Sequence, residues 1–250
     1  MNKTENIKGI VLAGGLGTRL DPLTRATNKH LLPVFDKPMV YYPIQTLVSA
    51  GISEIMVVTG GPHAGDFIKV LRNGEDFGLD KLHYAYQEGE GGIAHALAMA
   101  KTFVGDSKCA VILGDNLIFE DVSAAVEEFS KRDKGATIFT KTVHDPERFG
   151  VVKYEQLGAG ILDIVEKPKV PPSNDAVIGL YLYDNSVFDK IEKLSPSDRG
   201  ELEITDINRM YLGEGLDVRK IRGAWLDCGT PLSLAQATAT LLSDYKEINS

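Results

Sequence analysis

Several segments in the first half of the chain are apolar at every position, and this feature limits the fold more than any other. The runs IVLA (residues 10–13) and AVIL (residues 110–113) are of this kind. A strand is apolar throughout when helices cover both faces of its sheet, as in a parallel α/β sheet. Helix-like segments lie between these runs, in the order strand, helix, strand, helix. We therefore predict an α/β fold with a doubly wound, mostly parallel sheet.

The second half has a different pattern, with several strand-like segments and fewer helices between them. These segments are ATIFTKTV (136–143), GVVKYE (150–155), ILDIVEKP (161–168), AVIGLYLYD (176–184) and DVRKIRG (217–223). They predict a mixed or antiparallel β extension that forms one wall of a cleft. No low-complexity linker or internal repeat separates the halves, so we expect residues 1–250 to form a single domain. The segment from Pro231 has good helix formers and is expected to be a closing helix.

Charge and hydropathy exclude several classes of partner. The chain has 27 Lys and Arg against 35 Asp and Glu, a net charge of −8, which argues against binding of nucleic acid or of an anionic membrane. No segment reaches membrane-spanning length, and the N-terminus has no signal-peptide pattern, so we expect a cytoplasmic protein. The two cysteines, Cys109 and Cys228, lie beside apolar runs and are interpreted as buried thiols.

A glycine-rich loop follows the first strand. Gly14, Gly15 and Gly17 precede Arg19, at the sheet edge where open α/β sheets bind ligands. Glycines let backbone N–H groups turn toward phosphate oxygens, and a guanidinium suits two phosphate oxygens, although a tight structural turn would have the same pattern. A dehydrogenase would need glycine or alanine at Leu20, and an acidic residue at the end of a second strand. A P-loop would need Gly-Lys-Ser/Thr.

Two aspartates stand where apolar runs meet turns. Asp115 ends AVILGD, and Asp227 follows Trp225 and Leu226. Mg²⁺ is commonly held by one or two carboxylates together with phosphate oxygens and water, so both could bind one ion beside a triphosphate. The alternative is a turn or helix cap, which is common for an aspartate at a strand end.

A long stretch near the N-terminus resembles a known family. Residues 9–44, GIVLAGGLGTRLDPLTRATNKHLLPVFDKPMVYYPI, resemble the opening of bacterial and archaeal glucose-1-phosphate thymidylyltransferases, which are relatives of the uridylyl- and adenylyltransferases that act on sugar phosphates. The motifs LGDN, DPERFGVV, EKP, GLYLYD, RGELEITDIN and WLDCGT recur in the family's order, so the resemblance covers about residues 7–240. It implies a Rossmann-like nucleotidyltransferase fold, with residues 1–116 mainly nucleotide-binding and residues 117–230 mainly sugar-binding.

The resemblance also implies roles for individual residues. Those expected to be catalytic are Arg19, Lys29 and Asp115, and those expected to hold Mg²⁺ are Asp115 and Asp227. The expected nucleotide-binding residues are Leu12, Gly14, Gly15, Gly17, Thr18, Arg19, Gln87, Gly92 and Asp115. The expected sugar-phosphate-binding residues are Lys29, Asn116, Gly150, Glu166, Lys167, Val177, Gly179, Tyr181 and Arg199. Glu166 and Lys167 are neighbours on an extended segment, so their side chains should point to opposite sides unless the backbone bulges.

The expected reaction joins dTTP and α-D-glucose 1-phosphate to give dTDP-glucose and pyrophosphate. The Gln87 amide can pair with the imide edge of thymine or uracil, so a uridylyltransferase that uses UTP is an alternative. A catalytically silent regulatory subunit is another, but such a subunit would be expected to lose the cations or metal carboxylates that this chain retains. The resemblance allows a homo-oligomer, while the tetramer and the intersubunit feedback site of longer members stay open. Cys228 stands where we expect threonine.

Overall fold

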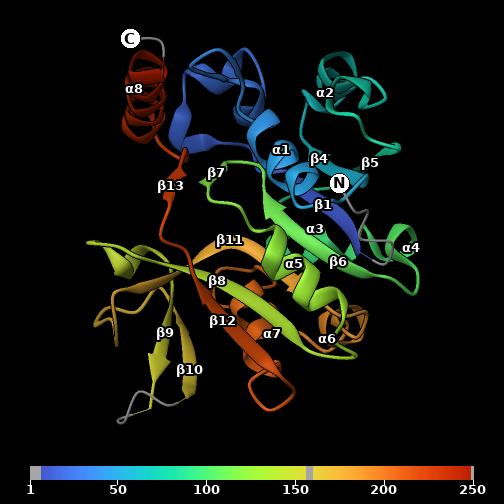
Figure 1. The fold of residues 1–250 in the computed structure, drawn as a ribbon, viewed down its shortest axis with the longest axis vertical. Helices are drawn as coiled ribbons and strands as arrows, with labels where there is room; N and C mark the ends of the chain where they lie inside the picture. The colour runs from blue at the N-terminus through green and yellow to red at the C-terminus, as the bar shows by residue number, and fades with distance from the viewer. Residues whose placement is uncertain (1–6, 156–159, 249–250) are drawn as a thin grey trace.

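One large sheet organises the structure, a computed structural model that describes residues 7–155 and 160–248 (Figure 1). Strands β1 (Ile7–Ala13), β4 (Glu54–Gly60), β5 (Lys81–Gln87) and β6 (Lys108–Leu113) come from the first half of the chain. They are all parallel, in the spatial order β6-β1-β4-β5. This confirms the parallel sheet that the fully apolar runs predict.

The second half continues the same sheet in a mixed arrangement. Its strands are β8 (Ala136–Thr142), β9 (Gly150–Tyr154), β10 (Ile161–Glu166), β11 (Asp175–Tyr183) and β12 (Leu216–Lys220). Strand β11 joins the two halves, because it pairs antiparallel with β8 along one edge and, along the other, with β6 and at Ala176 with β9. Strand β12 pairs parallel with β8, so the extension is mixed, as predicted.

Helices cover both faces of the sheet. The α-helices before the C-terminal one are α1 (Tyr41–Ser49), α2 (Ala64–Leu71), α3 (Ile93–Ala98), α4 (Lys101–Val104), α5 (Ser123–Ser130), α6 (Val187–Ile191) and α7 (Ile204–Met210). Helices α1, α2 and α5 share one apolar core, whereas α3, α6 and α7 share the other. Side chains along β1 alternate between these cores, because successive residues of a strand face opposite sides.

Smaller elements connect the sheet to the C-terminus. Short strands β7 (Asn116–Phe119) and β13 (Ala224–Asp227) pair antiparallel, and β2 (Pro33–Val34) pairs with β3 (Lys37–Pro38). The closing helix α8 (Pro231–Ile248), dark red in Figure 1, packs near β13 and β2. The 3-10 helices span Thr18–Leu20, Leu23–Arg25, Lys29–Leu31, Glu75–Phe77 and Pro146–Arg148.

Two further features bear on the predictions from sequence. Cys109 and Cys228 are both fully buried and free, which agrees with their interpretation as buried thiols. Within residues 7–155 and 160–248, no helix is both long enough and apolar enough to cross a membrane.

A glycine in β1 sets how closely α1 approaches the sheet. A Cβ atom added to Gly9 would lie 2.9 Å from Ile55 Cγ1 and 3.0 Å from Leu47 Cδ1, both in the buried core. We expect Gly9→Ala to lower the free energy of unfolding by about 1–3 kcal/mol through overpacking, measured by urea denaturation. Gly65→Ala, on α2 where a Cβ would meet nothing within 4 Å, is the matched control and should be neutral or slightly stabilising. Equal stability of the two variants would contradict this account of the packing.

Candidate active site

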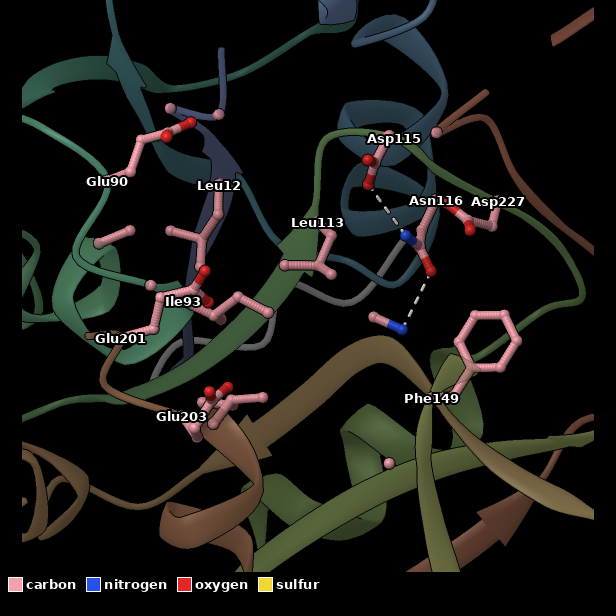
Figure 2. A pocket seen from close by; sticks show the side chains of 18 of the residues that line it. Leu12, Glu90, Ile93, Leu113, Asp115, Asn116, Phe149, Glu201, Glu203 and Asp227 are labelled. Carbon is pink, nitrogen blue, oxygen red and sulfur yellow. Dashed lines mark hydrogen bonds between the residues drawn. The ribbon is translucent and has the colours of Figure 1, made fainter. Parts of the chain in front are cut away.

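A cleft of about 800 Å³ opens at the carboxyl ends of the parallel strands β1, β5 and β6. Ligand sites in open α/β sheets form at this edge. The cleft is lined by every residue that the sequence predicts for the site: Leu12, Gly14, Gly15, Gly17, Thr18, Arg19, Lys29, Gln87, Gly92, Asp115, Asn116, Gly150, Glu166, Lys167, Val177, Gly179, Tyr181, Arg199 and Asp227. The structure thus brings these residues together, while their individual roles stay predictions. Figure 2 shows part of the lining.

The glycine-rich loop packs directly against Lys29. Gly17 has a positive φ of 70°, and a Cβ atom there would lie 2.9 Å from Lys29 Cβ. Lys29 itself begins a 3-10 helix that Asn28 caps, since Asn28 Oδ1 accepts a hydrogen bond from the backbone N–H of His30 at 3.0 Å. The lysine is therefore held beneath the loop whose N–H groups could bind phosphate.

Lys29 forms an ion pair with Asp115 that is mostly shielded from water. Its Nζ lies 2.5 Å from Asp115 Oδ2, and Asn116 Nδ2 donates to Asp115 Oδ1 at 3.1 Å. Burial by itself would raise the pKa of Asp115, but the positive charge of Lys29 and these hydrogen bonds outweigh it, so the pKa lies well below its ordinary value. Asp115 is therefore a carboxylate at neutral pH.

Asp227 is the second carboxylate at this point of the cleft, brought there by the pairing of β13 with β7. Asp227 stands opposite Asn116, and the N–H of Cys228 donates to the Asp115 carbonyl at 3.0 Å. Figure 2 shows both carboxylates on the same side of the cleft. Burial raises the pKa of Asp227, and the negative charge of Asp115 raises it further, against the opposing charges of Arg19, Lys29 and Arg148. Two neighbouring carboxylates, one buried and one partly buried, favour the binding of a cation.

This carboxylate pair fits a magnesium ion that also binds phosphate. Among the residues that the structure describes, no group of three or more His, Cys, Asp or Glu side chains could hold a metal. A site with its own full set of protein ligands is therefore absent from this part of the chain. Mg²⁺ commonly uses only one or two carboxylates and completes its coordination with substrate phosphates and water, which is what two aspartates in an open cleft allow.

Asn116 fixes the opposite wall at one point. Its Oδ1 accepts hydrogen bonds from the backbone N–H of Gly179 at 3.0 Å and from Trp225 Nε1 at 2.7 Å. At Gly179 a side chain has no room, because a Cβ atom would lie 2.6 Å from Leu113 Cγ. The amide thus ties the start of β7 to β11 and β13.

Glu166 and Lys167 lie on the far wall, and the structure resolves the expectation about their directions. Strand β10 ends at Glu166, and Lys167 has a positive φ of 41°, so the backbone turns there. Both side chains line the cleft, with Lys167 Nζ 3.5 Å from Glu166 Oε1. The extended strand ends at Glu166, so the alternation that would point the two side chains to opposite sides does not reach Lys167. Thr205 Oγ1 donates a hydrogen bond to the other Glu166 oxygen.

The described chain matches the family model of the nucleotidyl transferases over residues 8–244. The chain belongs to this family. A glucose-1-phosphate thymidylyltransferase from Neisseria gonorrhoeae is 45% identical over 237 residues, which are 93% of this chain and 82% of that protein.

Two solved structures of similar fold extend the comparison of this nucleotidyl transferase. One is a Bacillus anthracis protein assigned as a glucose-1-phosphate thymidylyltransferase, in complex with sucrose, with 48% identity, a TM-score of 0.88 and 94% of each chain covered. The other is a UDP-glucose pyrophosphorylase complexed with UDP-glucose, with 26% identity, a TM-score of 0.81, and 98% of this chain and all of that chain covered.

Sequence reasoning missed several residues that line the cleft of this nucleotidyl transferase. Arg148 Nη2 lies 3.5 Å from Asp227 Oδ2, and its guanidinium lies over the Phe149 ring, which meets the Trp225 ring edge-on. The period of two along AWLD places Trp225 on the same side of its strand as Asp227, and this signal could have identified it. Nothing in the sequence near Arg148 indicates its distant partner.

His30, also missed, is a buried imidazole next to the Lys29–Asp115 pair. Its Nδ1 lies 2.8 Å from Asn28 Oδ1, and the ring is 2% exposed. Burial, together with the nearby charge of Lys29, lowers the pKa of His30 from 6.5 to about 3. The folded protein therefore keeps this ring neutral over a range in which an unfolded chain would protonate it.

The His30 shift predicts how stability depends on pH. Between the unfolded pKa of 6.5 and the folded pKa of about 3, the unfolded state binds a proton that the folded state does not. The contribution of the neutral His30 ring to the free energy of unfolding is thus fully present above pH 6.5. It falls on acidification by up to about 1.4 kcal/mol per pH unit. We expect His30→Gln to remove this slope from denaturation curves measured in metal-free buffer. The control is His144→Gln, at an exposed position, and an acid slope that is unchanged in His30→Gln would exclude His30 as its source.

Proposed function

We propose that this chain joins dTTP and α-D-glucose 1-phosphate to give dTDP-glucose and pyrophosphate. The observation that carries the proposal is the arrangement of one cleft: a glycine-rich loop with Arg19 and Lys29 on one side, Glu166 and Lys167 on the other, and a carboxylate pair with them. Relatives named glucose-1-phosphate thymidylyltransferases, about 45% identical over most of the chain, support the choice of both substrates.

The proposed reaction is an in-line displacement at the α-phosphorus of dTTP. An oxygen of the sugar phosphate attacks, the bond from the α-phosphorus to the bridging oxygen breaks, and pyrophosphate leaves with that electron pair. The attacking oxygen is already an anion at neutral pH, so no side chain has to remove a proton from it. Catalysis then depends on alignment of the two substrates and on neutralisation of negative charge.

We assign the chain's first 116 residues mainly to the nucleotide. The backbone of the glycine-rich loop, from Leu12 through Gly14, Gly15, Gly17 and Thr18, would hold the phosphates, and Arg19 would clamp them. Gln87 and Gly92 would bind the base. Lys29 and Arg19 would neutralise charge at the reacting phosphates, so we assign both as catalytic residues together with Asp115.

Residues 117–230 would mainly hold the sugar phosphate. In the proposal, Glu166 accepts hydrogen bonds from sugar hydroxyls and Lys167 pairs with the phosphate, helped by Lys29. The remaining residues of this wall are Asn116, Gly150, Val177, Gly179, Tyr181 and Arg199. Arg199 is paired with Glu201 at 2.7 Å and with Glu203 at 3.1 Å, so it reaches a phosphate only by leaving those carboxylates.

Asp115 and Asp227 would hold Mg²⁺, in keeping with the divalent-metal dependence that is general in this family. When bound, the ion would neutralise charge on the phosphate oxygens. Lys29 now neutralises Asp115 at 2.5 Å, so metal binding there would release its ammonium toward the substrates. Arg148 lies 3.5 Å from Asp227, so metal binding at this second carboxylate would release its guanidinium in the same way.

A uridylyltransferase is the second candidate, favoured by the similarity to a pyrophosphorylase whose structure holds UDP-glucose. Thymine and uracil share the imide edge, and a methyl group in an apolar pocket changes specificity by only ~1–3 kcal/mol. A silent regulatory subunit is less well supported, because Arg19, Lys29 and both aspartates are present. A homo-oligomer stays a prediction.

A substrate panel tests the proposed function. We expect the purified chain to release pyrophosphate fastest with dTTP and glucose 1-phosphate, with UTP next and with CTP and ATP far slower. The imide edge that suits Gln87 is lacking in cytosine and adenine. The four triphosphates would be assayed against glucose, galactose and N-acetylglucosamine 1-phosphates. A best rate with ATP or CTP, or no turnover with any pair, would contradict the proposal.

The shared metal can be tested with single and double variants. Asp115→Asn and Asp227→Asn each remove a negative charge, and each should lower the rate on the order of 10²-fold or more. The double variant should lose much less than the product of the single losses, because both carboxylates act through one ion. Pyrophosphate release would be measured across a Mg²⁺ titration, and Mn²⁺ binding in the presence of dTTP by electron paramagnetic resonance.

The matched control for these variants is Asp76→Asn, an exposed carboxylate outside the cleft, which should change neither measurement. Near-normal activity and unchanged Mn²⁺ binding in Asp227→Asn would remove Asp227 from the metal site and return it to a turn residue.

A further inference from the structure

The amide of Gln87, at the end of β5, is held in one orientation. Its Nε2 lies 3.4 Å from the carbonyl oxygen of Gly92 and 3.1 Å from Nδ1 of His95. A carbonyl oxygen can only accept a hydrogen bond, so the amide atom that faces Gly92 has to be the nitrogen. The side-chain NH₂ has two hydrogens, and these two contacts account for both.

The same contact defines the tautomer of a neutral His95 ring. Because Gln87 Nε2 is a donor, His95 Nδ1 must carry a lone pair, so a neutral ring has its proton on Nε2. The imidazole fits closely at this point, since a Cβ atom on Gly91 would lie 2.4 Å from His95 Nδ1. His95 stands on α3 and does not line the cleft, whereas Gln87 does. Any effect of His95 on a ligand is therefore exerted through Gln87.

The carbonyl oxygen of the Gln87 amide consequently faces the other way, toward the glycine-rich loop. A Cβ atom on Gly14 would lie 2.4 Å from Gln87 Oε1, so only glycine leaves space for this oxygen. Within residues 7–155 and 160–248, no hydrogen-bond donor is paired with Oε1, and the side chain is 5% exposed. Gln87 Oε1 is thus an acceptor available to a ligand in the cleft, whereas both N–H donors of the amide are already paired.

This orientation discriminates between pyrimidines by a single atom. Thymine and uracil carry an N–H at ring position 3, which needs an acceptor, whereas cytosine has a bare nitrogen there, which needs a donor. If the amide turned over, its NH₂ would face the cleft and the preference would reverse. A site built to hydrogen-bond one group rejects a base that leaves the buried partner unpaired.

We propose that His95 is a positioning residue that determines base specificity, because it holds Gln87 with its oxygen toward an imide N–H. The proposal rests on the proposed function for the class of nucleotide that binds. The orientation of the Gln87 amide does not depend on that function. His95, which lies outside the cleft, would thus determine whether the site prefers thymine and uracil or cytosine. Gly14 and Gly92 complete the arrangement, the first by leaving room for the oxygen and the second by accepting from the nitrogen.

The orientation can be measured in the wild-type protein without any substrate. In two-dimensional ¹⁵N–¹H spectra of histidine side chains, His95 should show an unprotonated Nδ1 and a protonated Nε2. The Gln87 side-chain NH₂ should exchange slowly with solvent. A proton on Nδ1 of neutral His95, or a freely exchanging Gln87 amide, would overturn the proposal whatever the enzyme's activity.

Two substitutions test the effect on specificity. His95→Leu keeps a side chain of similar size but removes the acceptor, whereas His95→Asn places a carbonyl oxygen near the position of Nδ1. For His95→Leu we expect the ratio of kcat/KM for dTTP to that for dCTP to fall by about fivefold to tenfold, the effect of one hydrogen bond. The KM for glucose 1-phosphate should not change. His95→Asn should keep the ratio within about twofold of the wild type, since its acceptor restores the contact.

The outcomes separate this proposal from the proposed function. Wild-type activity with dTTP combined with an unchanged ratio in a folded His95→Leu protein would overturn the role of His95 alone. Equal losses with dTTP and dCTP, or a failure of His95→Asn to preserve the ratio, would do the same. If His95→Leu does not fold by circular dichroism, the spectra of the wild type and the ratio for His95→Asn decide. Binding of dTMP and dCMP by calorimetry gives the same comparison without turnover.

Discussion

One buried amide, that of Asn116, connects the parts of the chain that together form the cleft. It follows β6, the last parallel strand of the first half, and is 3% exposed. Its Oδ1 accepts from Gly179 on β11 and from Trp225 on β13, and its Nδ2 donates to Asp115. Asn116, Asp115 and Gly179 are buried and Trp225 is partly buried, so breaking these hydrogen bonds would leave polar groups with little access to water. The position of β11 and β13 relative to Asp115 depends on this side chain.

Charge balance is the second constraint on the cleft, and it depends on the first. Because Asn116 pairs with Asp227 across the β7–β13 ladder, two carboxylates come together in a partly buried place. Lys29 at Asp115 and Arg148 at Asp227 offset this repulsion. Both cations belong to loops or short helices, which can adjust more easily than the sheet. The arrangement therefore has cations that a metal could release toward phosphates, next to carboxylates that are held in place.

How much of this the sequence predicts depends on how local the cause is. The apolar runs 10–13 and 110–113 predict buried parallel strands, because every residue of each run is apolar and both faces of the strand can therefore be buried. The glycines of the loop and the aspartates at strand ends likewise indicate a ligand-binding edge. The helical run at residues 93–104, by contrast, is divided into α3 and α4, a break that its alanine-rich composition does not indicate.

The orientations of side chains in the cleft were beyond sequence reasoning. The positive φ of Lys167 turns it to the same side as Glu166, although lysine does not favour that backbone conformation. The contact of Arg148 with Asp227 joins elements that are distant in the sequence, and the contact of His95 with Gln87 depends on the path of the loop between β5 and α3; periodicity and motif spacing describe neither. Resemblance to a family supplies positions for Gln87, Glu166 and Lys167, but not the atoms that hold them.

The two amides of the cleft are fixed by opposite means, and this difference separates their tasks. Asn116 faces two N–H donors with its oxygen, so it is satisfied by the protein and serves to hold two walls together. Gln87 faces two acceptors with its nitrogen, so its oxygen is left for a ligand. An amide that could turn over would offer either a donor or an acceptor at nearly equal cost and would discriminate poorly. Groups that can only donate or only accept remove that freedom, so under the proposed function a neutral side chain would recognise the base and the charged residues would remain available for phosphates.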